Sequence, residues 1–406
     1  PRASLNDHES EESNPSPRVS TKRVATPAPP PAASQSRPRV STKKSSPRPS
    51  ASRGRDKEKE KAKEKEREKE EDENNNDDPI QKFISYALSK GVSGLRAEFD
   101  ELKQKVESIE IKDQRILRRC RQRISAFTSI WERMRRRIDT STVVSISSFL
   151  TVVLNRDVVC SDDSRVILKE LSMGTDYIHG NFCGTPKNPK RFICTQGPLP
   201  TTIVDFWSMV WQEGSEFIVM LCNFNEMGKV KCAQYFPPME KETLVAGNAV
   251  ITCDTVARQK WPGQITIRRF TLDRIDVNQK RTITHLHWES WPDRGVPPID
   301  STIQKLLQMV CRSSKPAVVH CSAGIGRTGT TVAIQIVTEL MDSGKTMDTG
   351  LGPFLIKMRK QRAGSVQNDQ QYVFIHRLLL ERYMSEEEKD NPKFAKFAKD
   401  YDALMV

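Results

Sequence analysis

Residues 317–329 read Ala-Val-Val-His-Cys-Ser-Ala-Gly-Ile-Gly-Arg-Thr-Gly, which predicts a buried strand, a tight loop and the start of a helix. The apolar run places Cys321 at the carboxyl end of the strand, and the glycines let the backbone curl. Successive N–H groups of such a loop converge into an anion-binding nest at the positive N-terminus of the helix. Arg327, six residues after the cysteine, can fold back over this nest and grip two anionic oxygens. The stretch therefore predicts a phosphate-binding site.

The sulfur of Cys321 lies in the same electrostatic field. Helix N-termini and adjacent cations lower the pKa of a cysteine, so that the thiolate exists at neutral pH. A thiolate beneath a bound phosphorus atom is a nucleophile with an oxyanion clamp around it. A buried, unreactive cysteine is the commoner case, and we give that interpretation to the other eight of the nine cysteines. In this loop, a nucleophile is the better interpretation of Cys321.

Residues 320–329, HCSAGIGRTG, resemble the signature HCxxGxxR[ST]G of the cysteine-dependent protein tyrosine phosphatases, in the form typical of the tyrosine-specific branch. The resemblance is continuous from residue 155 to about residue 383, with a weaker start at 94–102. The chain resembles a non-receptor-type domain of this family, and it does not resemble the compact dual-specificity branch. Six further segments match the family in the expected order: 176–181 (DYIHGN), 195–200 (TQGPLP), 205–207 (DFW), 231–235 (KCAQY), 291–297 (WPDRGVP) and 361–362 (QR).

The resemblance implies a two-step reaction with a role for each of several side chains. Cys321 attacks an aryl phosphate and forms a phosphocysteine. Asp293 resembles the general acid that protonates the leaving phenolate and later deprotonates water, and its Pro and Gly neighbours suit a mobile loop. Gln367 matches the glutamine that positions this water, and Gln371 matches its helper. The Thr328 hydroxyl is able to stabilise the thiolate as it leaves in the second step.

Further residues are expected to bind the phosphate or to support the site. Glu226 resembles the carboxylate that fixes the signature arginine, and Lys231 resembles the lysine that approaches the acid-bearing loop. Trp291 begins that loop, and His320 orients the cysteine by hydrogen bonding and is not a general base. Asp157 matches an acidic residue of the substrate-recognition loop. No metal-binding cluster is apparent, the mechanism needs none, and we expect no cofactor. The phosphate is expected to contact Ser322, Ala323, Gly324, Ile325, Gly326 and Arg327.

The match fails at the recognition loop. The family normally carries Asn-Arg-Tyr there, with the tyrosine packed against the substrate ring, but residues 155–158 read Asn-Arg-Asp-Val. Directly upstream, 112–138 holds ten Lys or Arg and two acidic residues, 143–154 is apolar, and neither stretch resembles the family. Three explanations stay open: a genuine insertion that alters substrate recognition, an element that binds a partner or polyanion, or a sequence artefact that displaced the normal loop. A genuine loop predicts a wider entrance, weaker binding of phosphotyrosine and poorer discrimination against smaller phosphoesters.

The composition divides the chain unevenly. Only 36% of its 406 residues are hydrophobic and 29% are charged, with a net charge of +13, so part of the chain cannot bury a core. Short Val- and Ile-rich runs followed by helical patterns predict an α+β domain, with a large mixed β-sheet flanked by helices. We expect five regions: a disordered tail (1–78), N-terminal helices of the catalytic domain with a break at Gly91 (79–111), an atypical basic and apolar insert (112–154), the catalytic core (155–384) and a C-terminal tail (385–406).

These observations favour an active protein tyrosine phosphatase whose partners are phosphotyrosine-containing proteins. The alternative is a phosphotyrosine-binding scaffold with little activity, because the tyrosine before Asp157 is missing. A nucleic acid or an anionic membrane is a weaker candidate partner, for the basic stretch 112–138. The cysteines form no CxxC pair, and no apolar run is long enough to span a membrane. We therefore expect a soluble protein of the cytoplasm or nucleus.

Overall fold

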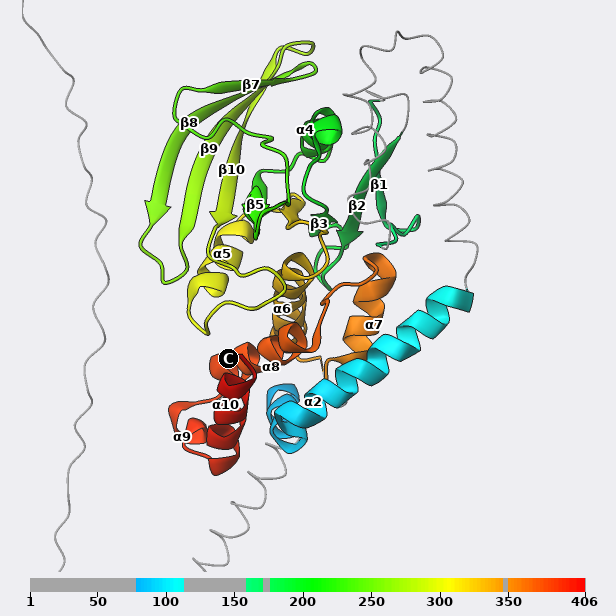
Figure 1. The fold of residues 1–406 in the computed structure, drawn as a ribbon, viewed down its shortest axis with the longest axis vertical. Helices are drawn as coiled ribbons and strands as arrows, with labels where there is room; N and C mark the ends of the chain where they lie inside the picture. Colours follow the sequence, from blue (N-terminus) through cyan, green and yellow to red (C-terminus); the bar gives the residue numbers. More distant parts are fainter. Residues whose placement is uncertain (1–77, 113–157, 171–175, 346–349, 406) are drawn as a thin grey trace, which may run out of the picture. The chain divides into compact units, whose positions relative to one another are not determined.

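The computed structural model describes residues 78–112, 158–170, 176–345 and 350–405, with side chains described only as far as residue 105 in the first range. Figure 1 shows the described elements as a coloured ribbon. The predicted N-terminal tail and the predicted insert lie outside these ranges, apart from residues 78 and 112. The predicted substrate-binding residue Asp157 also lies outside them.

A mixed sheet of nine strands forms the centre of the fold, in the order β1-β2-β3-β11-β4-β10-β9-β8-β7. The neighbours β3, β11, β4 and β10 run parallel, and the remaining pairs are antiparallel. This arrangement confirms the predicted α+β class. The strands are β1 (Arg165–Ile167), β2 (Tyr177–Cys183), β3 (Phe192–Thr195), β4 (Phe217–Met220), β7 (Thr243–Ala246), β8 (Ala249–Gln259), β9 (Ile265–Arg274), β10 (Gln279–Trp288) and β11 (Ala317–His320).

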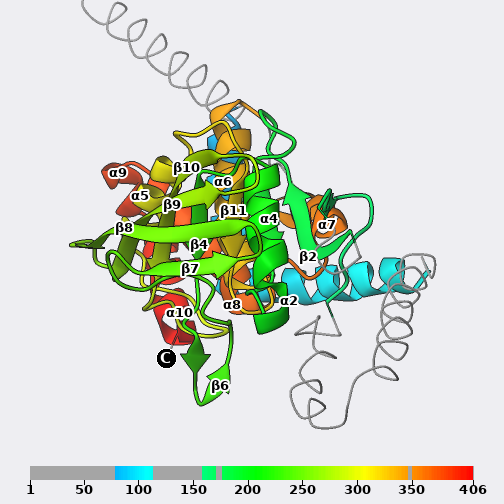
Figure 2. The ribbon, with the colours of Figure 1, turned by 90° about the horizontal axis from the view of Figure 1, so that it is seen from above.

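Helices flank this sheet, as predicted. In Figure 1, α4 lies beside the upper part of the sheet, whereas α2 and α6 to α10 gather below it. A separate two-stranded hairpin of β5 (Asn225–Glu226) and β6 (Lys229–Val230) projects from the body of the domain (Figure 2). The helices are α2 (Pro79–Lys112), α4 (Ile203–Gln212), α5 (Thr302–Val310), α6 (Arg327–Asp342), α7 (Gly352–Gln361), α8 (Asp369–Tyr383), α9 (Glu386–Lys389) and α10 (Pro392–Met405), with a 3-10 turn at Pro200–Thr202.

The central strands explain where the chain delivers Cys321. Every residue of β3 and β11 is buried, because parallel strands are covered on both faces and require continuous apolar runs. Strand β11 lies between β3 and β4, and Cys321 follows its last residue, His320. The cysteine is therefore held at the carboxyl edge of the sheet, directly before α6.

Two strands of the nine-stranded sheet lack the apolar runs that mark its other strands. Strand β2 buries the polar side chains of His179 and Asn181, so its sequence shows no hydrophobic pattern. Strand β7 is short and lies at the sheet edge, where Thr243 and Val245 are exposed. The other seven strands of this sheet contain the Val- and Ile-rich runs on which the α+β prediction was based.

The N-terminal helix α2 is part of the same packed domain. Its backbone breaks helical geometry at Gly91, where φ is 62° and ψ is 177°, at the predicted position. Beyond this kink, Glu98 accepts hydrogen bonds from the hydroxyls of Tyr86 at 2.5 Å and Tyr372 at 2.7 Å. Tyr372 lies in α8, and its ring packs against Phe99 with centroids 5.5 Å apart. These contacts fix α2 against α8.

The predicted C-terminal tail contains two helices. Phe394, Phe397 and Tyr401 of α10 recur on one face of that helix and are buried. The side chain of Gln370, at the start of α8, donates to the carbonyl of Leu404 at 3.1 Å.

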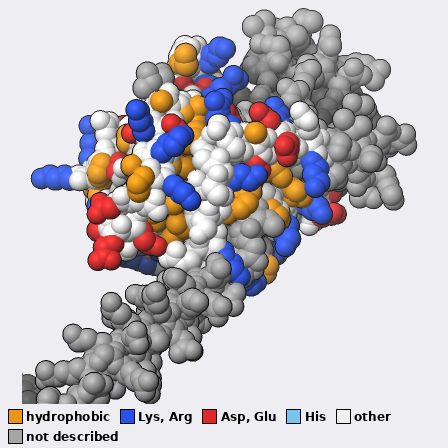
Figure 3. Space-filling model, turned by 90° about the horizontal axis from the view of Figure 1, so that it is seen from below, with side chains coloured by type: hydrophobic (Ala, Val, Ile, Leu, Met, Phe, Trp, Pro, Cys, Tyr) orange, Lys and Arg blue, Asp and Glu red, His pale blue; other side chains and the backbone are white. Residues whose placement is uncertain are grey.

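Seen from below, the domain has Lys and Arg side chains dispersed among hydrophobic ones (Figure 3). Within the described ranges, no helix has both the length and the apolar character needed to cross a membrane.

Candidate active site

The loop between β11 and α6 is held in shape from outside. Gly324 has φ of 70°, and a Cβ atom there would lie 2.1 Å from the carbonyl oxygen of Thr195, so only glycine fits. Arg362 donates to the carbonyls of Gly324 at 3.0 Å and Ala323 at 2.9 Å. These carbonyls are thereby turned toward Arg362, and the Gly324 N–H donates to Sγ of Cys321 at 3.2 Å.

Arg362 is a supporting residue that the sequence did not reveal. It is fully buried and also donates to Oδ1 of Asn181 at 2.9 Å and to Nδ1 of His179 at 3.2 Å. Burial, together with the nearby Arg362 charge, lowers the pKa of His179 to about 3, so its neutral ring can accept this bond. The segments 176–181 and 361–362 matched the family, but only their burial in the fold shows that they brace the loop together.

The electrostatic field of the loop favours a thiolate. Burial alone raises the pKa of Cys321, but the Arg327 guanidinium, the Thr328 hydroxyl and amide, and the Gly324 amide lower it on balance. The Thr328 hydroxyl is buried and makes no hydrogen bond to another group, so it is available to the sulfur. Burial dominates and raises the pKa of other thiols, namely those of Cys222, Cys232 and Cys253.

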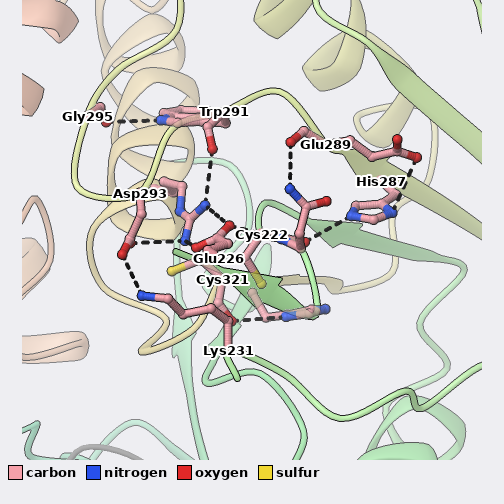
Figure 4. Close-up of polar contacts among 12 residues, drawn as sticks. Cys222, Glu226, Lys231, His287, Glu289, Trp291, Asp293, Gly295 and Cys321 are labelled. Carbon is pink, nitrogen blue, oxygen red and sulfur yellow. Dashed lines mark hydrogen bonds and ion pairs between the residues drawn. The ribbon is translucent and has the colours of Figure 1, made fainter. Parts of the chain in front are cut away.

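Arg327 is fixed beside this sulfur by the β5–β6 hairpin. Its two terminal nitrogens donate to the two carboxylate oxygens of Glu226, at 2.6 and 2.8 Å (Figure 4). The same nitrogens donate to the carbonyl of Trp291 at 3.1 Å and to Oδ1 of Asp293 at 3.2 Å. Only 3% of the Arg327 side chain is exposed, so the guanidinium is immobilised before any phosphate enters.

Asp293 is placed between two cations. Its Oδ2 lies 2.5 Å from Nζ of Lys231, and its Oδ1 contacts Arg327. Burial raises the pKa of Asp293, but the Lys231 hydrogen bond and the charges of Arg327 and Lys231 lower it on balance. In this arrangement Asp293 is a carboxylate at neutral pH.

Most of the predicted site residues line one cavity. Its volume is about 210 Å³, and chain segments far apart in the sequence contribute to it. Ile325 does not line the cavity, and its carbonyl instead accepts from Val366 N–H at 3.0 Å. The lining residues are Lys229, Val230, Lys231, Asp293, Arg294, Cys321, Ser322, Ala323, Gly326, Arg327, Gln367 and Gln371.

The two glutamines approach the cavity from the start of α8. The backbone N–H of Gln367 donates to Oε1 of Gln371 at 2.8 Å. A Cβ at Gly326 would lie 2.9 Å from Oε1 of Gln367, so both side chains lie close against the loop. Val366, directly before Gln367, has φ of 60°, an unusual conformation for a β-branched residue. The backbone therefore stores strain next to Gln367, the residue to which the resemblance gave the positioning of water.

His320 contacts the backbone of Cys321 rather than its sulfur. Its Nδ1 lies 3.2 Å from the Cys321 carbonyl, and its Nε2 lies 2.7 Å from the hydroxyl of Tyr235. Burial lowers the pKa of His320 to about 3, so the ring is neutral. It is therefore placed to orient the strand end. In the part of the chain that the structure describes, no group of three or more His, Cys, Asp or Glu side chains could hold a metal ion.

A cysteine and a fixed guanidinium share one cavity, and this is the arrangement expected of a site that binds phosphate. The family model described as protein-tyrosine phosphatase matches residues 153–381, more than half of the chain. The chain therefore belongs to the protein-tyrosine phosphatase family. The match leaves residues 112–152 outside it.

Individual relatives agree with this family. Human receptor-type tyrosine-protein phosphatase F is 39% identical over 232 residues, which are 55% of this chain and 12% of the relative. Human receptor-type tyrosine-protein phosphatase H is 36% identical over 236 residues, 55% of this chain and 20% of the relative. The chain thus spans a fifth or less of these relatives' lengths.

Solved structures extend the comparison to the fold. PTPN18 in complex with HER2 phosphopeptides aligns with a TM-score of 0.62 at 29% identity, over 76% of this chain and 100% of that one. The catalytic domain of human protein tyrosine phosphatase non-receptor type 18 aligns with a TM-score of 0.54 at 29% identity, over 65% and 98%.

Proposed function

We propose that this chain is a protein tyrosine phosphatase that hydrolyses phosphotyrosine through a phosphocysteine intermediate. One observation carries the proposal: the Cys321 thiol, whose pKa is lowered, faces the same cavity as the immobilised Arg327 guanidinium. A nucleophile and a clamp for phosphate oxygens are the two parts that a thiol-based phosphoryl transfer requires.

In the first step, the phosphate dianion binds between the loop amides and Arg327. The sulfur forms a bond to phosphorus while the bond to the phenolic oxygen breaks, and Asp293 gives its proton to that oxygen. The dianion favours prior protonation of Asp293, because it competes for Arg327 and places like charge beside the carboxylate. Asp293 thereby changes from an ion-pair partner to a general acid.

In the second step, water attacks phosphorus and the bond to sulfur breaks. Gln367 would position this water and Asp293 would accept its proton, with Gln371 holding the Gln367 backbone. The Thr328 hydroxyl would stabilise the departing thiolate. The reaction releases inorganic phosphate and regenerates the ionised cysteine.

Turnover of phosphopeptides tests the proposed function. We expect the full chain to release phosphate from a phosphotyrosyl peptide, because the Cys321 nucleophile and the Arg327 clamp line the same cavity. Peptide binding measured by calorimetry without phosphate release would instead support the scaffold alternative.

An acidic partner for 112–138 and a cytoplasmic or nuclear location stay predictions from the sequence.

The Lys231→Met protein is expected to keep its activity to higher pH than the wild type. The Lys231 hydrogen bond lowers the pKa of Asp293 against the effect of burial, so its removal raises that pKa. A general acid works in its protonated form, which is lost as pH rises through its pKa. The measurement is kcat for phenyl phosphate against pH, with the exposed Lys260 changed to Met as control. If the alkaline limb of the kcat–pH profile stays in place or moves to lower pH in Lys231→Met, the role given to Lys231 is contradicted.

A further inference from the structure

A side chain at the start of α8 hydrogen-bonds to the backbone of the acid-bearing loop. Asn368 donates from its Nδ2 to the carbonyl oxygen of Arg294, at 2.6 Å. Arg294 directly follows Asp293, and Asn368 directly follows Gln367. The contact therefore joins the neighbour of the proposed acid to the neighbour of the proposed water-positioning glutamine.

The same amide also caps the helix. Oδ1 of Asn368 accepts from the N–H of Gln371 at 2.9 Å, as the N-cap of α8. A helix N-H needs an acceptor and a carbonyl needs a donor, so only one orientation of the amide satisfies both groups. Asp, Ser and Thr also cap helices well, but their side chains cannot supply an amide donor. The cap alone therefore does not explain why the residue is asparagine.

The carbonyl that Asn368 holds belongs to a strained turn. Arg294 has φ of 60°, and the turn closes with a bond from Gly295 N–H to the Pro292 carbonyl at 3.3 Å. Glycine or asparagine is preferred in a left-handed position of such a turn, and arginine is not. Strained segments persist where surrounding contacts hold them, and the Asn368 bond is such a contact.

The side of this contact that Asn368 provides, at the start of α8, is anchored to helix α2. Asp369, the next residue, pairs with Arg96 of α2 at 2.6 Å, and Tyr372 donates to Glu98 of the same helix. Helix α2 therefore holds the start of α8 in place, and Asn368 offers the acid-bearing loop a fixed docking point.

We propose that Asn368 is a positioning residue, which holds the acid-bearing loop over the cavity so that Asp293 reaches the leaving oxygen. The inference rests on the proposed phosphatase function. Asn368 does not touch the substrate and acts through Asp293. Replacing Asn368 should therefore slow hydrolysis most for substrates whose leaving group needs a proton from Asp293.

The test compares Asn368→Ser with the wild-type full chain on two esters. The serine keeps the helix cap but is too short to reach the Arg294 carbonyl. We expect kcat/KM for phenyl phosphate, which has a basic leaving group, to fall about 3- to 10-fold. For 4-nitrophenyl phosphate, which needs little protonation, we expect a fall below about twofold. Asn391→Ser is the matched control, because Asn391 accepts from a backbone N–H at the start of α10.

A double-mutant cycle separates positioning from a structural effect. In the Asp293→Asn background, Asn368→Ser should have no further effect on kcat/KM. Equal losses for both esters, or a loss that persists in the Asp293→Asn background, would overturn the inference while the phosphatase function stands. A wild-type chain that hydrolyses neither ester would refute the proposed function, and the inference with it.

Discussion

The Cys321→Ser protein is expected to hydrolyse phenyl phosphate more than about 1,000-fold more slowly than the wild type. Arg327, Thr328 and Gly324 lower the pKa of the thiol against the effect of burial, so that it ionises readily. A serine hydroxyl has a far higher pKa, and the same field cannot ionise it near neutral pH. The loss should therefore appear in kcat, whereas binding of an oxyanion such as tungstate should stay close to that of the wild type, because the loop amides and Arg327 are unchanged.

The control for this change is a cysteine elsewhere in the domain. Cys311 is exposed and follows α5, away from the residues that line the active-site cavity. Cys311→Ser should retain wild-type kcat and KM. Steady hydrolysis by a Cys321→Ser preparation free of wild-type protein would show that the sulfur is not the nucleophile.

Arg327→Lys is expected to lower kcat/KM for aryl phosphates about 100- to 1,000-fold and to weaken tungstate binding as well. Lysine offers a point charge instead of the planar fork that Glu226 holds with two bonds, at 2.6 and 2.8 Å. It therefore cannot grip two phosphate oxygens in the fixed orientation that the transition state requires.

The two substitutions differ in a measurable way. Cys321→Ser should spare tungstate binding, and Arg327→Lys should reduce it, because only the second removes the clamp. Calorimetric titration of both proteins makes this comparison, with the exposed Arg312 changed to Lys as control. Undiminished tungstate binding by Arg327→Lys would contradict the role given to the guanidinium.

The sequence was most informative where function depends on neighbouring residues. The strand, loop and helix at 317–329 are contiguous, so their pattern predicted both the buried β11 and the helix α6 after it, and the phosphate site between them stays a prediction. The roles of Arg362 and Asn181 could not be predicted in the same way. They lie 181 positions apart, and only the packing of β2 beside the loop reveals their hydrogen bond.

Part of the ion pairing in the site was beyond prediction from the sequence. The resemblance implied that Glu226 fixes Arg327 and that Lys231 approaches the acid-bearing loop, but the contact of Asp293 with Arg327 depends on where the loop lies. The C-terminal helix was missed for a different reason. Phe394, Phe397 and Tyr401 have helical spacing, but in a short segment that also holds five charged residues three such positions are a weak signal.

The most direct test of the account is to find the phosphate on the sulfur. A turnover mixture of wild-type protein and a phosphotyrosyl peptide is quenched within milliseconds, digested, and analysed by mass spectrometry. We predict a phosphorylated peptide with the modification on Cys321, and no such peptide from Cys321→Ser. Phosphate release without any phosphorylated Cys321, or with the phosphate on another residue such as His320, would contradict the central claim.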